Sequence, residues 1–186
     1  PFLYQGEEIG MTNFPFRDET QLRDVESLNL LAQARKDGRE AWDWNGIRKK
    51  GRDNARTPMQ WDASANAGFT AGTPWIDVNP NYRQINVHEA QADPDSILHF
   101  YRRLLALRQG SDALRSGTFR LLLPEHPQLL AYERACGEER IRVCCNFSGA
   151  PAVLPSEIQG DCLLCDGVEN GRMEPYGLCC VQLLHY

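Results

Sequence analysis

The densest group of side chains that could bind a ligand lies between Lys50 and Asp62, in the run KGRDNARTPMQWD. The run contains two arginines, two aspartates, an asparagine, a glutamine and a tryptophan, and its glycine and proline argue against a continuous helix. Guanidinium and amide groups form paired hydrogen bonds, and an indole offers a flat apolar face, so the run is suited to holding a polyhydroxylated ligand. From composition alone, a structural loop whose polar groups bond to its own backbone is the interpretation to prefer.

Two adjacent carboxylates, Glu7 and Glu8, form a second candidate group, shortly after the apolar segment Phe2–Tyr4 and separated from it by Gln5 and Gly6. The working residues of an α/β barrel lie at such carboxyl ends of strands. A glycosidase pair, however, must face each other across the scissile bond, whereas successive residues usually point in different directions. We therefore expect Glu7 and Glu8 to bond to the backbone of their own loop.

All seven cysteines lie between Cys136 and Cys180. The adjacent pairs 144/145 and 179/180 would point to opposite faces of a strand, so neither pair readily serves one site. The spacing of Cys162 and Cys165 is that of metal ligands, but a second such pair is missing from the sequence. We expect no metal site, reduced thiols that pack as small core residues, and a cytoplasmic protein.

The apolar pattern predicts the elements that position these groups. Phe2–Tyr4 is expected to be a short buried strand of the parallel type. Helices are expected over 24–35, with Val25, Leu28 and Leu31 as the apolar stripe, and over 40–50. The small and aromatic residues of 66–75 predict an irregular surface loop. A further helix is expected from 95 to 109, with Ile97, Tyr101, Leu104 and Leu105 on its buried face.

After Gly117 the period changes to that of short strands. Strands are expected over 118–123, 128–134, 140–147, 152–154, 161–165 and 178–185, separated by turns such as Asn170-Gly171. This spacing predicts a small antiparallel β-sandwich of about 75 residues. The predicted domains are therefore 1–110 and 111–186. His126 and His185 lack partners at an informative spacing, and the second domain is not expected to be catalytic.

Composition excludes several classes of protein. The net charge of -5 argues against a nucleic-acid or anionic-membrane partner. The sequence contains no apolar run near the roughly 20 residues that span a bilayer. The sequence opens on Pro1 and an apolar segment that would need neighbouring strands. We therefore expect the carboxyl-terminal part of a longer protein.

Several runs together resemble the α-amylase superfamily, and within it the bacterial oligo-1,6-glucosidase, α-glucosidase and dextran glucosidase group. They are PFLYQGEEIGMTN (1–13), RDVE (23–26), GRDNARTPMQWD (51–62), NAGFT (66–70) and VNPNY (78–82). The resemblance covers residues 1 to about 110 and implies the fold class: the last strand and helices of a (β/α)8 TIM barrel, followed by the small antiparallel β-sandwich.

The resemblance also implies a retaining mechanism, in which two carboxyl groups about 5 Å apart act as nucleophile and acid/base. The family carries these residues, and a third carboxylate that stabilises the transition state, on the fourth, fifth and seventh strands. This sequence has no Gly-Phe-Arg-x-Asp run and no His-Asp pair. We therefore expect none of the catalytic trio here, and an isolated chain that is inactive.

By resemblance, Arg52 reaches the terminal glucose subsite, and Arg56 either contacts substrate or braces the loop. The expected function is that of an exo-acting α-glucosidase on short α-1,6- or α-1,4-linked oligosaccharides, without a cofactor. Trehalose-6-phosphate hydrolase and sucrose isomerase are neighbouring alternatives, and a non-catalytic module that binds glycan or another partner is the alternative from another class. The motif Lys-Ser-Arg-Asp-Asn-Ser of the phosphate-specific hydrolases differs from KGRDNA at 50–55, which favours the oligoglucosidase. Linkage preference and oligomeric state stay open.

Overall fold

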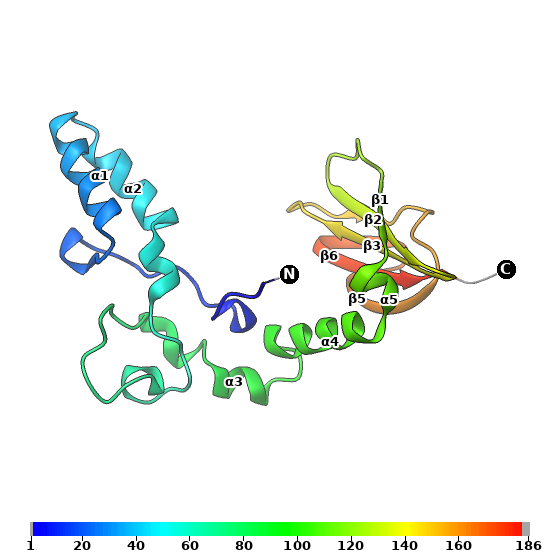
Figure 1. Ribbon diagram of the computed structural model, residues 1–186, viewed down its shortest axis with the longest axis horizontal. Helices are drawn as coiled ribbons and strands as arrows, with labels where there is room; N and C mark the ends of the chain where they lie inside the picture. Colours follow the sequence, from blue (N-terminus) through cyan, green and yellow to red (C-terminus); the bar gives the residue numbers. More distant parts are fainter. Residues whose placement is uncertain (1, 184–186) are drawn as a thin grey trace. The chain divides into compact units, whose positions relative to one another are not determined.

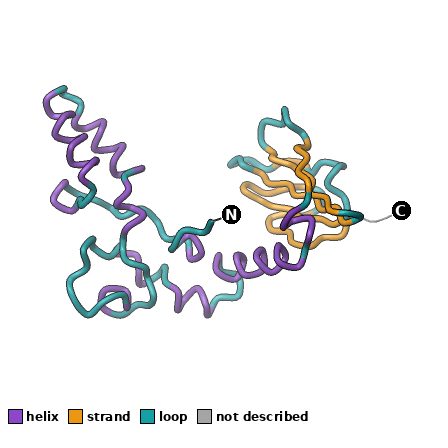
Figure 2. The backbone as a smooth tube through the Cα atoms, viewed as in Figure 1, coloured by secondary structure: helices purple, strands orange, loops and turns teal. Residues whose placement is uncertain are grey.

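Residues 2–183 are described by a computed structural model, in two compact units, Pro1–Tyr101 and Arg102–Tyr186. The division falls within helix α4 (Ile97–Gly110), while the domain boundary at 110/111 stays a prediction. Figure 2 shows the first unit as helices and loops, and the second as mainly strands. Within residues 2–183, no helix is long and apolar enough to cross a membrane.

The first unit is organised by a pair of helices, α1 (Val25–Lys36) and α2 (Glu40–Lys50), which lie side by side (Figure 1). Helix α1 begins at Val25 because the side chain of the preceding residue, Asp24, accepts hydrogen bonds from the backbone N–H and the hydroxyl group of Ser27, at 3.1 and 2.8 Å. The apolar core of this unit is formed by Phe14, Phe16, Leu22, Leu31 and Ile47. The first unit also contains helix α3 (Val87–Ala92) and five short 3-10 turns, Glu7–Ile9, Glu19–Gln21, Arg52–Arg56, Ala65–Gly68 and Pro80–Arg83.

Several predicted core positions of the first unit are exposed. Phe2, Leu3 and Tyr4 are not in a strand and are 103%, 48% and 53% exposed, so the predicted burial of this segment is wrong for this chain. A strand is held by hydrogen bonds to a neighbour, and the described residues supply none here. Val25 and Ile97 of the first unit are also exposed, as is Leu104 in the part of helix α4 that belongs to the second unit, whereas Leu31 is buried as predicted.

The second unit consists of helix α5 (Asp112–Ser116) and an antiparallel sheet. Its strands are β1 (Thr118–Leu122), β2 (Leu129–Cys136), β3 (Glu139–Asn146), β4 (Ala152–Val153), β5 (Asp161–Glu169) and β6 (Arg172–Gln182). The order is β1-β2-β3-β6-β4, and β5 also pairs with β6, so β6 has three neighbours. The predicted strands are confirmed in order, although residues 184 and 185 of the last lie outside the described part.

The sheet of the second unit is apolar on both faces. One face carries Ala131, Cys144, Cys179 and Val181 and packs against segments that include Ala152, Ile158 and Met173. The opposite face carries Ile141, Val143, Cys145 and Cys180 and packs against Ala113 of α5. The neighbours Cys144 and Cys145, like Cys179 and Cys180, therefore point to opposite faces, as predicted.

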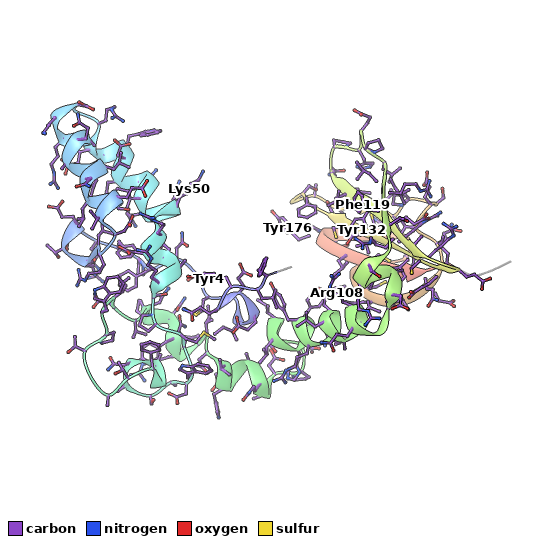
Figure 3. The ribbon with its side chains drawn as sticks, in the orientation of Figure 1. Tyr4, Lys50, Arg108, Phe119, Tyr132 and Tyr176 are labelled. Carbon is purple, nitrogen blue, oxygen red and sulfur yellow. The ribbon has the colours of Figure 1, made fainter. Side chains whose placement is uncertain are left out.

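Two details fix the geometry of the strands. The turn between β5 and β6 is Asn170-Gly171, and both residues have positive φ (48° and 73°), which is the conformation of a two-residue type I′ hairpin. On β1 and β2 the rings of Phe119 and Tyr132, labelled in Figure 3, lie 5.3 Å apart. Such cross-strand aromatic contacts stabilise a particular register.

Candidate functional site

The polar run that follows α2 begins with a close backbone approach at Gly51. A Cβ atom on Gly51 would lie 2.6 Å from the carbonyl oxygen of Ile47, so a side chain cannot fit without a shift of the backbone. The chain then forms the 3-10 turn Arg52–Arg56, and Pro58 follows it. The prediction of a loop, and not a continuous helix, is confirmed.

The buried carboxylate of Asp53 joins this turn to the start of α1. Asp53 is 1% exposed, and its Oδ2 accepts hydrogen bonds from the backbone N–H groups of Arg23 and Asp24, at 2.7 and 2.9 Å. These two N–H groups precede the first turn of α1, where helix partners are not available. Asp53 therefore fixes the position of Asp24 relative to the turn.

Asp24 links the helix cap to an arginine. Its Oδ2 accepts from Ser27, and its Oδ1 accepts a hydrogen bond from Nη2 of Arg52 at 2.8 Å. Burial pushes the pKa of Asp24 upward, but the hydrogen bonds from Ser27 and Arg52 and the charge of Arg52 outweigh it, and the net pKa is lowered. Asp24 is therefore a carboxylate at neutral pH and a charged partner for Arg52.

Arg52 is held at one end of its guanidinium group and open at the other. The same Nη2 that contacts Asp24 lies 2.6 Å from Oε2 of Glu26, while the side chain is 55% exposed. A guanidinium group has five N–H donors, and the contacts found within the described residues use only Nη2. Nε and Nη1 are thus available to bind a ligand.

Arg56 lies deeper in the same charge group. Its Nη1 is 3.7 Å from Asp24 and 3.6 Å from Asp53, and its side chain is 37% exposed. These distances exceed those of good hydrogen bonds, so the contacts are mainly electrostatic. Arg56 offsets the charge of two buried carboxylates, which suits a residue that braces the loop.

The rest of the run is anchored by amide side chains. Asn54 accepts a hydrogen bond from the backbone N–H of Phe14 at 3.0 Å and donates to the carbonyl groups of Arg48 and Gly51, at 3.1 and 3.2 Å. Gln60 is fully buried and donates to the carbonyl group of Ile85. The run is therefore tied to the segments on both sides of it.

Arg52 also lines a cleft of ≈ 420 Å³ in the first unit. This volume falls within the range of about 300–1,000 Å³ typical of small-molecule sites. The cleft is lined by Tyr4, Gln5, Gly6, Glu7, Met11, Thr12, Asn13, Lys49, Lys50, Gly51, Arg52, Asn54, Ala55 and Thr57. Figure 3 labels two of these residues, Tyr4 and Lys50. The loop after Tyr4 and the polar run therefore form two walls of one cleft.

The carboxylates of Glu7 and Glu8 bond to their own loop, as predicted. Oε2 of Glu8 accepts from the backbone N–H of Gly6 at 2.7 Å, and Oε2 of Glu7 accepts from that of Tyr4 at 3.3 Å. Over residues 2–183, no group of three or more histidine, cysteine, aspartate or glutamate side chains is arranged to hold a metal ion. The cleft of the first unit is thus lined by charged and amide side chains, among others.

Sequence reasoning named the two arginines but missed the carboxylates that position them. Asp24 precedes an apolar helical stripe and is recognisable as a helix cap from the sequence. Asp53 is separated from its partners by about thirty residues in the sequence, and nothing in its local pattern predicts burial.

Residues 1–117 match the catalytic domain of the α-amylase family. The chain belongs to this family. Among curated proteins, the oligo-1,6-glucosidase of Parageobacillus thermoglucosidasius is 49% identical over 164 residues, which cover 85% of this chain and 29% of that enzyme. The trehalose-6-phosphate hydrolase of Escherichia coli is 50% identical over 149 residues, covering 80% of this chain and 27% of that enzyme.

Solved structures of the family resemble the chain as well. The trehalulose synthase of Pseudomonas mesoacidophila MX-45 superimposes with a TM-score of 0.90 at 34% identity, covering 98% of this chain and 35% of that one. The chain thus spans between 27% and 35% of the length of these three proteins. The predicted fold class, the last strand and helices of a (β/α)8 barrel followed by a small antiparallel β-sandwich, is confirmed by the family match and its structural neighbours, although Phe2–Tyr4, the segment predicted to be that strand, does not form one in this structure.

Proposed function

We propose that this chain is part of a retaining, exo-acting α-glucosidase that releases glucose from short α-1,6- or α-1,4-linked oligosaccharides. The observation that carries the proposal is the environment of Arg52. Two carboxylates hold its guanidinium group, the side chain remains half-exposed, and Arg52 lines a cleft of suitable size. The similarity to oligo-1,6-glucosidases supports the choice of substrate class. A cytoplasmic location is part of the same proposal.

In this proposal the chain binds and orients the sugar, and the reacting carboxylates come from polypeptide outside residues 1–186. Retention needs two carboxyl groups about 5 Å apart on opposite sides of the glycosidic bond. The free N–H groups of Arg52 would donate to hydroxyl groups of the terminal glucose, with Arg56 as a second, weaker candidate. Because Asp24 and Glu26 hold the guanidinium before substrate arrives, little conformational entropy is lost when the sugar binds.

A trehalose-6-phosphate hydrolase is the second candidate. Lys49 and Lys50 line the same cleft as Arg52, and this group of cations would suit a phosphorylated sugar. Identity does not separate the two candidates, since the relatives of each kind are 49% and 50% identical. Sucrose isomerase is a further alternative, supported by the structural similarity to trehalulose synthase.

The substrate class is tested on the complete protein that contains this chain, with isomaltose, maltose, trehalose 6-phosphate and sucrose at equal concentration. We expect the highest kcat/KM on isomaltose or maltose, and α-glucose as the first anomer seen by proton NMR. A preference for trehalose 6-phosphate, or conversion of sucrose to an isomer, would replace the proposal with the corresponding alternative.

The isolated chain tests the alternative of a non-catalytic binding module. We expect residues 1–186 alone to leave a chromogenic α-glucoside intact while the complete protein cleaves it. If the complete protein binds isomaltose but does not hydrolyse any of the four sugars, the binding-module alternative is correct.

A further inference from the structure

Three thiols of the second unit lie in contact on strands β5 and β6, which are labelled in Figure 1. The sulfur atoms of Cys162 and Cys165 are 2.6 Å apart, and that of Cys165 is 3.1 Å from that of Cys179. All three cysteines are free in this structure, and the first two are exposed. The proposed glycosidase activity makes no use of them.

An irregularity in β5 brings the first two thiols together. In a regular strand, residues three apart point to opposite faces. The pairing of β5 with β6 is Cys162 with Val181 and Cys165 with Cys179, with a register shift between Cys162 and Leu164. The extra residue in this β-bulge turns the spacing of three into an effective spacing of two, so that both thiols lie on one face.

We infer that Cys162 and Cys165 form a reversible disulfide, which makes the β5 bulge a redox modification site. The reaction partner is a small-molecule disulfide such as oxidised glutathione. The thiolate of Cys162 attacks one sulfur of the small disulfide, forms a mixed disulfide and releases one thiol, and Cys165 then attacks the mixed disulfide and releases the second thiol. Two protein thiols are oxidised, one small disulfide is reduced, and the two protons of the cysteines end on the two released thiols.

Solvent exposure favours a disulfide between Cys162 and Cys165 over one between Cys165 and Cys179. Cys162 and Cys165 are accessible to a reagent, whereas Cys179 is 3% exposed and packs in the apolar core beside Cys144. The closest sulfurs, those of Cys162 and Cys165, are 2.6 Å apart, within about 0.6 Å of the length of a disulfide bond.

The rate of oxidation should depend on pH. The pKa of Cys162 is raised to about 11, first by its hydrogen bond to Cys165 and then by burial. The thiolate is the attacking species, so it is scarce at neutral pH and increases as the pH rises. We therefore expect the rate to rise about tenfold per pH unit between neutral pH and the pKa.

The test uses the complete protein that contains this chain, in its folded form. After treatment with oxidised glutathione, remaining thiols are alkylated and the linkages are mapped by mass spectrometry. We expect a mass loss of two hydrogen atoms, a link between Cys162 and Cys165, and an alkylated Cys179. Dithiothreitol should restore both thiols.

Two variants act as matched controls. Cys136→Ser removes an exposed cysteine at the end of β2 and should leave the link unchanged, whereas Cys162→Ser should abolish it. Glutathione adducts on Cys162 without an internal link would overturn the inference. A predominant link between Cys165 and Cys179 in the folded chain would overturn it as well.

Discussion

Replacing Asp53 by alanine tests whether one buried carboxylate holds the binding loop in place. In the structure its Oδ2 accepts two backbone N–H groups, at 2.7 and 2.9 Å, and the residue is 1% exposed. Alanine would leave the buried N–H group of Asp24 and the part-buried N–H group of Arg23 without this partner; a buried unpaired group costs about 1–3 kcal/mol, and a part-buried one costs less. The variant should therefore lose roughly 1–4 kcal/mol of unfolding free energy in the first unit.

Urea unfolding followed by tryptophan fluorescence measures this loss. All four tryptophans lie between Trp42 and Trp75, so the signal reports on the first unit alone. Asp53→Asn keeps one carbonyl acceptor and should lose less, about 1–2 kcal/mol. Asp95→Ala is the control, because Asp95 is exposed and its replacement should change stability by no more than about 0.5 kcal/mol.

Asp53 should also affect the binding of substrate. If Asp53 acts by positioning Asp24 and through it Arg52, then Asp53→Asn in the complete enzyme should raise KM more than it lowers kcat. A loss of stability below about 1 kcal/mol for Asp53→Ala, measured by the same unfolding curve, would refute the assignment of the carboxylate as a structural anchor.

Four further predictions follow from the described contacts. Arg52→Ala in the complete enzyme should lower kcat/KM at least about tenfold, near 1.4 kcal/mol, and Arg52→Lys should recover part of it; unchanged kinetics would remove Arg52 from the site. The pKa of Asp24 is lowered in the folded state, so its charged form stabilises the fold above pH 3.8, the ordinary pKa of an aspartate, and this stability should be lost as the pH falls below 3.8. In an acid titration followed by tryptophan fluorescence, Asp24→Asn should show a smaller dependence on pH in this range. Glu133 is buried and accepts hydrogen bonds from Arg142 at 2.9 Å and Arg120 at 3.1 Å, so Glu133→Gln should lower the unfolding free energy of the second unit by about 1–2 kcal/mol. Thermal unfolding of the sheet followed by circular dichroism measures this loss, and an unchanged melt would exclude a stabilising role. Cys144 is fully buried and burial raises its pKa to about 11, so iodoacetamide at neutral pH should label the exposed Cys136 and spare Cys144 until the fold opens.

Elements that depend on local chemistry were predictable from the sequence. Helix α1 begins at a side-chain cap and follows an apolar stripe, so its bounds needed no tertiary information. The opposite orientation of Cys144 and Cys145 follows from the alternation of a strand. The hairpin turn Asn170-Gly171 was also predictable, because both residues tolerate positive φ.

Features that depend on distant partners were not predictable. Phe2–Tyr4 has the composition of a buried strand, but burial requires neighbouring strands that the described residues do not supply. The role of Asp53 depends on backbone groups about thirty residues earlier, and that of Cys162 on a bulge whose position only the pairing reveals. The sequence named the arginines of the candidate site, but the carboxylates that orient them came from tertiary structure.

The position of β6 has a consequence for how the second unit is made. This strand is the last of the six in the sequence and yet pairs with β3, β4 and β5. While a ribosome is still synthesising residues 172–182, the three earlier strands have exposed edges and cannot join into one sheet. The sheet is therefore completed only once residues 172–182 have been synthesised, and a stop codon soon after Asn170 would leave β3, β4 and β5 without the strand that joins them.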